Sequence, residues 1–392
     1  MGEHPAQHDR VQRPGARDGQ DLAHTGALLW TETDLAQVRA DGADPDLVEQ
    51  GYRDLRDNHV TFDQIMDWLQ TFRRSDRRSS WRRPPAPAIT LLGVPMITDL
   101  SYAPADPPGG RGHLLDLHLP STTSDGPLPV LIWTGGSGWM ADNGKDSAGL
   151  IAEIFNPMGY AVAGVSIRAS SQATFPAQLH DIQAAIRWLR DHAAEHHLDP
   201  DRFAIMGDSS GGWTAAMAAL TGAADPPSAV RAAVAFYPPT NFLQMDEQMP
   251  PGAREFFNDT FGLTACHDDP ASPESALLGF PIQTRPDEVR ATDPATYASP
   301  AAPPIMILHG QDDRFVPHGQ SVLLYNALRA AGATATFFSV PGAGHDRREV
   351  LDPANHIGHT VHLTAGGTEH ITVGAPAPSW EAIGDFLRTA LR

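Results

Sequence analysis

The chain contains almost no cysteine and almost no lysine, and it has no long hydrophobic run. Cys266 is the only cysteine among 392 residues, which excludes an intramolecular disulfide and a cysteine-built metal cluster. No stretch of about 18 apolar residues occurs, so a membrane-spanning helix is not expected. The N-terminal residues MGEHPAQHDRVQRPGARDG also lack the apolar run of a secretion signal. These absences predict a soluble, cytoplasmic protein without membrane insertion.

Positive charge is scarce as well. Forty-seven acidic residues against 28 basic ones give a formal net charge of -19, and Lys145 is the only lysine. Nucleic acid and anionic lipid repel so acidic a chain, so neither is an expected partner. Eighteen histidines are present, but no HExxH or similarly spaced ligand set occurs. We therefore expect no bound metal.

The first 85 residues differ in composition from the rest. Residues 1–20 are polar and contain glycine and proline, which predicts disorder. Apolar residues recur at helical spacing across residues 32–72. The next segment, RRSDRRSSWRRPPAPA, indicates an exposed linker, a strap whose arginines pair with the acidic body, or an anion site. The predicted division is an extension over residues 1–85 and a main domain over residues 86–392.

From about residue 89 onward, short apolar runs alternate with helical patterns. HLLDLHL (113–119) alternates like a half-buried strand, and AQLHDIQAAIRWLRDHAAE has one apolar helical stripe. This alternation predicts an α/β domain with a mainly parallel central sheet flanked by helices. Residues 238–300 interrupt it and are rich in proline, aspartate and phenylalanine, which predicts a lid or binding insert. Near-continuous apolar runs, typical of strands covered on both faces, occupy residues 129–133, 160–167, 203–206, 230–237, 304–309 and 334–340.

The stretch FAIMGDSSGGWTAAMAAL contains the pattern GxSxG between a predicted strand and a predicted helix. A nucleophilic serine has to project from a sharp, strained turn, and the glycines on either side tolerate the close backbone approach. Ser209 is the central serine of the pattern, so we predict that it is the nucleophile. The alternative is a glycine-rich turn in which Ser209 or Ser210 caps a helix.

A serine nucleophile needs a base, and the base needs an acid that orients it. HGQDDRFVP and PGAGHDRRE each follow a predicted strand, which places Asp312 or Asp313 and His345 at the same sheet edge as Ser209. Spacing alone does not choose between the two aspartates. Four later histidines compete with His345, but none directly follows a strand and a glycine turn: His356, His359, His362 and His370.

Backbone N–H donors for an oxyanion are the third requirement. The loop TGGSGW follows the predicted strand PVLIW, and its glycines allow amides to point inward. The amide of Ser210, directly after the nucleophile, is the second expected source. A plain glycine turn is the alternative interpretation of this loop.

Together these motifs resemble the α/β-hydrolase superfamily, in particular the hormone-sensitive-lipase-like and feruloyl-esterase-like carboxylesterases, over roughly residues 89–345. The resemblance implies an α/β-hydrolase domain that cleaves carboxylic esters through an acyl-serine intermediate and needs no cofactor. It selects Asp313 as the acid. It maps the oxyanion donors to Ser137 and Gly138, beside the amide of Ser210, and it implies a substrate pocket lined by Trp139, Gly136 and Asp208.

The resemblance has departures and leaves alternatives open. The family motif HGGGW reads GGSGW here, with Gly135 in place of the histidine and Ser137 in place of a glycine. Residues 346–378 lie outside it and form either a small hairpin near the site or a surface excursion. The main prediction is a hydrolase of short to medium acyl or aryl esters. An amide, lactone or thioester hydrolase or acyltransferase, and a noncatalytic binding protein, are the alternatives, and monomer or homodimer stays open.

Overall fold

The computed structural model describes residues 95–121 and 126–392. The predicted extension, with its disordered arm, its helices and its arginine-rich linker, lies outside these residues, so the boundary between residues 85 and 86 stays a prediction. No helix in the described part of the chain is both long and apolar enough to cross a bilayer.

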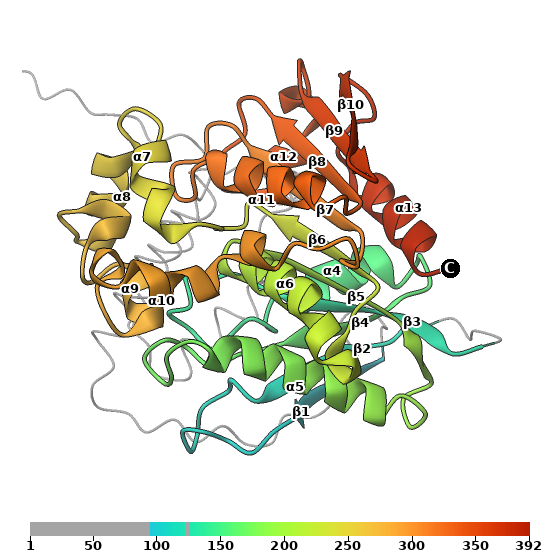
Figure 1. Cartoon of the computed structure of the whole chain (residues 1–392). Coiled ribbons are helices and arrows are strands. Elements are labelled where there is room, and N and C mark those ends of the chain that lie inside the picture. Colours follow the sequence, from blue (N-terminus) through green and yellow to red (C-terminus); the bar gives the residue numbers. More distant parts are fainter. Residues whose placement is uncertain (1–94, 122–125) are drawn as a thin grey trace, which may run out of the picture. The chain divides into compact units, whose positions relative to one another are not determined.

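The strands join in a single mixed sheet (Figure 1). Its order is β1-β2-β4-β3-β5-β6-β7-β8-β9-β10, and the six strands from β4 to β8 in that order run parallel to their neighbours. The predicted mainly parallel centre is therefore confirmed, with antiparallel strands added at both edges. The strands are β1 (Met96–Ser101), β2 (Leu114–His118), β3 (Leu128–Thr134), β4 (Ala161–Val165), β5 (Leu198–Asp208), β6 (Ala232–Phe236), β7 (Ile305–Gly310), β8 (Ala335–Val340), β9 (Thr360–Ala365) and β10 (Thr368–Val373).

Helices follow most of the parallel strands, as the alternating pattern predicted. The short helices α7 to α10 all belong to the insert between β6 and β7, and they gather at one end of the sheet (Figure 1). The α-helices are α4 (Ala148–Phe155), α5 (Ala177–Asp191), α6 (Ser210–Thr221), α7 (Met245–Gln248), α8 (Ala253–Phe261), α9 (Pro273–Leu278), α10 (Pro286–Val289), α11 (Gly319–Ala330), α12 (Arg347–Val350) and α13 (Trp380–Ala390).

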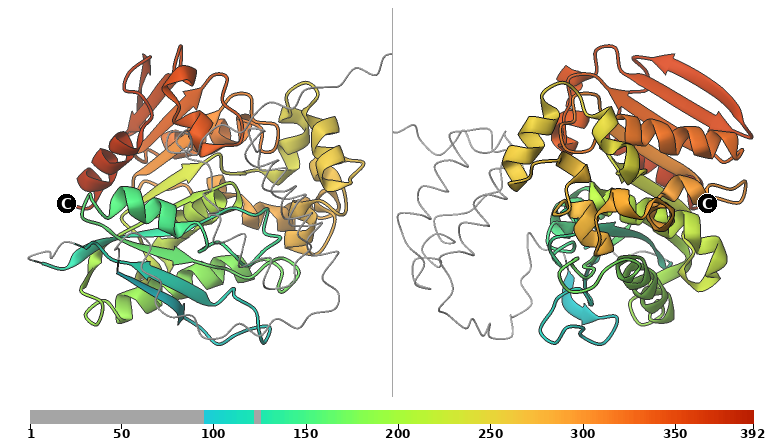
Figure 2. Two further views of the ribbon diagram at one scale, coloured as in Figure 1. Left: turned by 180° about the vertical axis from the view of Figure 1, so that it is seen from behind. Right: turned by 60° about the vertical axis from the view of Figure 1, so that its left-hand side comes forward.

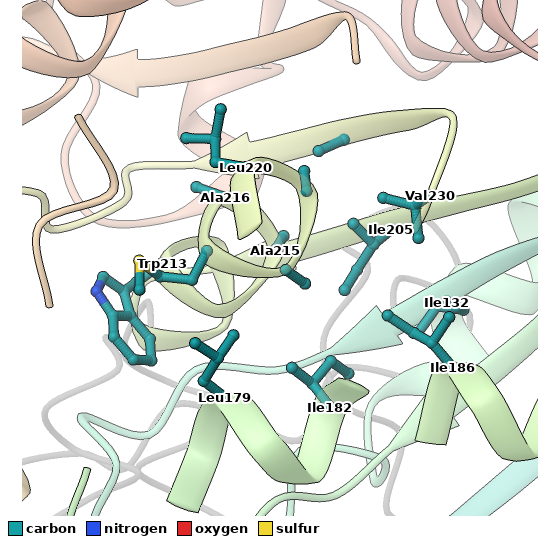
Figure 3. Packing of buried hydrophobic residues seen from close by; sticks show 14 of the residues in the cluster. Ile132, Leu179, Ile182, Ile186, Ile205, Trp213, Ala215, Ala216, Leu220 and Val230 are labelled. Carbon is teal, nitrogen blue, oxygen red and sulfur yellow. The ribbon is translucent and has the colours of Figure 1, made fainter. Parts of the chain in front are cut away.

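Successive side chains of the central strands enter two separate cores. In β3, Val130 and Ile132 pack with residues of α5, α6 and α11, whereas Leu131 and Trp133 pack with residues of α4 and α13. This alternation follows from the two-residue period of a strand. Figure 3 shows Ile182 and Ile186 of α5 packing toward the sheet. Both faces are therefore covered, which explains why the strand sequences are apolar throughout.

Two edge regions differ from the sequence predictions or refine them. Residues 113–119 contain the predicted strand, but the expected half-burial was wrong, because four of the five residues of β2 are buried. Its polar side chain Asp116 does not face solvent but meets the ammonium group of Lys145. At the other edge, β9 and β10 form the hairpin that was one interpretation of residues 346–378, and β9 extends the sheet from β8 (Figure 2).

Candidate active site

Ser209 lies on a sharp turn between β5 and α6. Its φ of 53° and ψ of −126° are a conformation that non-glycine residues rarely adopt. The backbone of β3 approaches this turn so closely that only glycine fits at position 211. A Cβ on Gly211 would lie 2.1 Å from the carbonyl oxygen of Thr134. The amide of Ser209 donates to the carbonyl of Phe236 in β6. The structure therefore raises the Ser209 hydroxyl at the carboxyl end of the sheet on a strained backbone.

The loop after β3 lies directly against this turn. Gly136 approaches so closely that a Cβ there would lie 2.7 Å from Ser209 Cβ and 2.4 Å from the Asp208 carbonyl oxygen. The amide of Gly136 donates to Asp208 Oδ1 at 2.7 Å, and the amide of Ser137 donates to Ser210 Oγ at 2.9 Å. The residues predicted to supply oxyanion donors are thus brought together. The Ser137 amide engages the Ser210 hydroxyl in this arrangement.

Asp313 and His345 form a buried carboxylate–imidazole pair. His345 Nδ1 lies 2.6 Å from Asp313 Oδ2, and the Asp313 side chain is fully buried. The other oxygen, Oδ1, accepts the amides of Phe315 and Val316. Burial alone would raise the pKa of Asp313, but the facing imidazoles of His345 and His309 outweigh it and hold that pKa well below its usual range. Asp313 is therefore an ionised acceptor that orients the imidazole.

The other aspartate of the pair considered from sequence, Asp312, is exposed. Its backbone amide donates to the carbonyl of Ala343. The geometry thus distinguishes the two aspartates, which spacing alone did not.

Two contacts connect the serine turn to the Asp313–His345 pair. The first passes through the end of β6, where Phe236 accepts the Ser209 amide and the ring of the next residue, Tyr237, lies 4.3 Å from the His345 ring. The second is an ion pair between Asp208 and Arg347, two residues after His345. Asp208 therefore connects two loops. Its Oδ1 accepts the amide of Gly136, and its Oδ2 pairs with Arg347, which lies just after His345.

A serine on a strained turn, an adjoining loop rich in amides and a buried aspartate–histidine pair thus lie at one sheet edge. A family model, BD-FAE, matches residues 115–328, which is more than half of the chain. The chain belongs to the BD-FAE family. Its relatives include the esterase LipQ of Mycobacterium tuberculosis, 31% identical over 262 residues, and the probable carboxylic ester hydrolase LipM of the same organism, 26% identical over 277 residues. The matches cover 63% and 66% of this chain but only 56% and 60% of those relatives.

Solved structures place this BD-FAE member in the α/β-hydrolase fold. A truncated carbohydrate esterase from gut microbiota is 28% identical, with a TM-score of 0.58, and the match covers 75% of this chain and 95% of that one. The carboxylesterase EstE1 from a metagenomic library is 18% identical with a TM-score of 0.54 over 76% of this chain and 89% of its own, which shows the fold alone. The predicted resemblance to the carboxylesterase branch of this superfamily is confirmed.

The insert of this BD-FAE member packs against the loop after β3. Trp139 is buried, with its ring 5.3 Å from Trp213 and 5.4 Å from Phe242 of the insert. A Cβ on Gly138 would lie 3.6 Å from Pro273 Cβ of α9. The insert therefore contacts the loop at Trp139 and Gly138, and its role as a lid stays a prediction. Contact of substrate with Trp139, Gly136 or Asp208 stays a prediction.

Sequence reasoning missed two side chains of the site. His309, the last residue but one of β7, directs Nε2 to Asp313 Oδ2 at 3.2 Å and Nδ1 to Ser321 Oγ at 2.7 Å. His309 lies in the sequence LHGQDD, so the sequence shows that it precedes the acid. It does not show that His309 contacts Asp313. Arg347 lies 139 positions from Asp208, and no local pattern signals such a pair.

Proposed function

We propose that this protein is a serine carboxylesterase whose catalytic residues are Ser209, Asp313 and His345. The observation that carries the proposal is the strained serine turn placed against an amide-rich loop and connected to a buried aspartate–histidine pair. Esterase names among the relatives support the same reaction class. The substrate would be a small-molecule ester, and the three residues would act without a cofactor.

In this mechanism His345 takes the proton of Ser209 as its oxygen attacks the ester carbonyl. Asp313 holds the imidazole with Nδ1 toward the carboxylate, so that Nε2 is the nitrogen that accepts the proton. His345 then gives the proton to the oxygen of the leaving alcohol as the ester C–O bond breaks. The alcohol departs, and an acyl-serine remains. Water repeats the sequence in the second half of the reaction and releases the acid.

The oxyanion would be held by backbone amides of Ser137, Gly138 and Ser210. The Ser137 amide already has an acceptor in Ser210 Oγ at 2.9 Å, so the hydroxyl orients this amide before substrate arrives. When the oxyanion forms, the amide would exchange a neutral acceptor for a negatively charged one, and charge-assisted hydrogen bonds are the stronger kind. The hydroxyl of Ser210 thus supports the loop in the resting state.

Short to medium acyl or aryl esters are the substrates that we propose. Phe315 beside His345, and Phe256 5.2 Å from Phe315, give the region around the base an aromatic character. A panel that varies acyl length against one constant leaving group would locate the limit of the acyl pocket. Comparing kcat/KM for matched ester, amide, lactone and thioester substrates would test the preferred bond.

We also propose that the protein acts in the cytoplasm.

Covalent labelling tests the assignment of Ser209. A fluorophosphonate is expected to modify wild-type protein at Ser209, and Ser209→Ala should abolish labelling, because only an activated hydroxyl reacts. Ser121→Ala, at an exposed position, is the matched control and should label like wild type. Tandem mass spectrometry would separate Ser209 from its neighbour Ser210. Labelling that persists in Ser209→Ala would overturn the proposal in favour of another nucleophile or a noncatalytic protein.

Arg347 is predicted to act as a positioning residue through Asp208. Its guanidinium pairs with Asp208 and lies 4.6 Å from the centre of the Trp133 ring. Arg347→Leu should lower kcat by roughly 10- to 100-fold, because small displacements of the serine turn and the oxyanion loop are costly, while KM changes little. Arg347→Lys should recover part of this loss.

Arg348→Leu is the matched control for this prediction. Arg348 pairs with Asp346 of its own loop and is largely exposed, so its loss should leave kcat within about twofold. Equal kcat losses in Arg347→Leu and Arg348→Leu, or a loss in Arg347→Leu that follows a fall in melting temperature, would argue for a merely structural role.

A further inference from the structure

A second cluster of reactive side chains lies in the insert, away from the Ser209 turn in sequence. One potential ligand atom from each of Asp246, Cys266 and His267 lies within 4.8 Å of the others, and all three residues are buried. Asp246 belongs to α7, whereas Cys266 and His267 belong to the 3-10 turn Cys266–Asp268. Glu274 of α9 stands beside them, with Oε1 3.1 Å from His267 Nδ1. Three segments of the insert thus converge on one point.

Several polar atoms of this cluster have no hydrogen bond among the described residues. Neither ring nitrogen of His267 forms one, although Nδ1 is close to Glu274, and Glu274 Oε2 also lacks a partner. The exposed fractions of His267 and Glu274 are only 1% and 4%. Burying imidazole nitrogens and a carboxylate oxygen without hydrogen bonds is costly, so the arrangement calls for a ligand that satisfies them.

We propose that Asp246, Cys266 and His267 bind a divalent transition-metal ion of the zinc type, with Glu274 held beside the imidazole. Thiolate, imidazole and carboxylate together are the donors of zinc-type sites, whereas magnesium and calcium take oxygen donors alone. Carboxylates beside a ligating imidazole commonly fix the ring and raise its basicity. The site depends on the insert alone, so it stands apart from the proposed esterase reaction.

The charges around the cluster suit a dication. Asp246 Oδ2 pairs with Arg254 at 2.9 Å, and Asp246 Oδ1 accepts the amide of His267 at 2.8 Å, which leaves further lone pairs on both oxygens. With Cys266 as a thiolate, Asp246, Cys266, Glu274 and Arg254 would carry a net charge of about −2, and the carboxylate of Asp268 also acts on Asp246 and His267, so the surroundings attract a dication.

Metal binding would exchange the thiol proton for the metal. Without a metal ion, a cysteine thiol ordinarily carries its proton at neutral pH. On binding, an M–S bond forms as the S–H bond breaks, and the proton passes to solvent without any change of oxidation state. One proton should therefore be released from Cys266 for each metal ion bound.

A metal ion here would fasten the insert over the oxyanion loop. It would tie α7 to the 266–268 turn, and His267 would connect that turn to Glu274 of α9, which begins at Pro273 facing Gly138. The His267 ring also contacts the Phe257 ring in a tilted arrangement with centroids 4.1 Å apart, and the Phe257 ring lies 6.3 Å from that of Phe315. We therefore expect the ion to stabilise the lid rather than to contact substrate.

Cobalt(II) absorption tests the site directly. Full-length protein without a histidine tag, stripped with a chelator, is titrated with CoCl2 and then with ZnCl2. We expect one equivalent of cobalt to produce a thiolate-to-cobalt charge-transfer band, and zinc, which binds such donors more tightly, to remove it. Cys266 is the only cysteine of the chain, so this band can arise from no other residue. Excess zinc should also raise the melting temperature of the wild-type protein.

Variants separate this site from adventitious binding. Cys266→Ser should lose the charge-transfer band, and His267→Gln or Glu274→Gln should weaken cobalt binding by about 10- to 100-fold. His180→Gln, at an exposed histidine of α5, is the matched control and should bind like wild type. The absence of both the band and the melting shift in wild-type protein would overturn the proposal even if the variants fail to fold. A band of undiminished affinity in His267→Gln would overturn the ligand set.

Discussion

His345→Ala is expected to lower kcat toward an ester substrate by roughly three or more orders of magnitude, as loss of the base does in serine triads. Without the imidazole no group accepts the Ser209 proton during attack or protonates the leaving alcohol. The binding surface is unchanged, so KM should move far less than kcat. Initial rates across a range of substrate concentrations would separate the two constants.

The same substitution should leave the fold intact. Removing the His345 ring does not strand the buried Asp313 carboxylate, because His309 Nε2 and the amides of Phe315 and Val316 still face it. A circular dichroism melt beside the assay should therefore differ little from wild type. His370→Ala, at an exposed position of β10, is the matched control and should retain full kcat. If kcat of His345→Ala falls less than about tenfold, His345 is not the base.

The site residues that local sequence predicts follow strands of the same parallel sheet, and this has one physical consequence. In a parallel sheet, residues just past the ends of neighbouring strands meet at one edge, so a serine after β5, an aspartate after β7 and a histidine after β8 had to converge. Those strands could be predicted from continuous apolar runs, because both faces of the sheet are covered.

Contacts that join distant polar residues could not be predicted in this way. The pair between Asp208 and Arg347 and the hydrogen bond from the Ser137 amide to Ser210 Oγ depend on how two loops dock. No periodicity encodes such docking. The same holds for Asp246 and Cys266, which are twenty positions apart without any motif between them.

The edges of the sheet were harder to predict because their signals are weak. β1 has only six residues with alternating exposure, β9 mixes buried, half-buried and exposed residues, and β10 is exposed over most of its length. In β2 the polar residue Asp116 suggested a solvent face, whereas the structure covers that face and pairs Asp116 with Lys145. An alternating strand sequence shows which positions are polar. It does not show whether a polar side chain faces solvent or a buried ion-pair partner.

The second large predicted effect is a loss of folding stability when the Lys145–Asp116 ion pair is broken. Lys145 Nζ is buried and lies 2.7 Å from both Asp116 oxygens and 2.9 Å from Asp99 Oδ1. Lys145→Met should destabilise the fold by about 3 to 5 kcal/mol, because it leaves the Asp116 carboxylate buried without its cation. The melting temperature, or the midpoint of urea unfolding, would measure this loss.

Two further variants decide whether the loss comes from stranded charge or from lost packing. Arg111→Met removes a largely exposed ion pair with Asp146 nearby and should cost less than about 1 kcal/mol. The double variant Lys145→Met/Asp116→Leu should recover most of the stability lost in Lys145→Met, since no buried carboxylate then remains uncompensated. A double variant as unstable as the single one would mean that Lys145 stabilises the fold by packing its stem, not by neutralising Asp116. The ammonium group of Lys145 is a compact charge with three donors, and it contacts both carboxylates of this junction, Asp116 and Asp99.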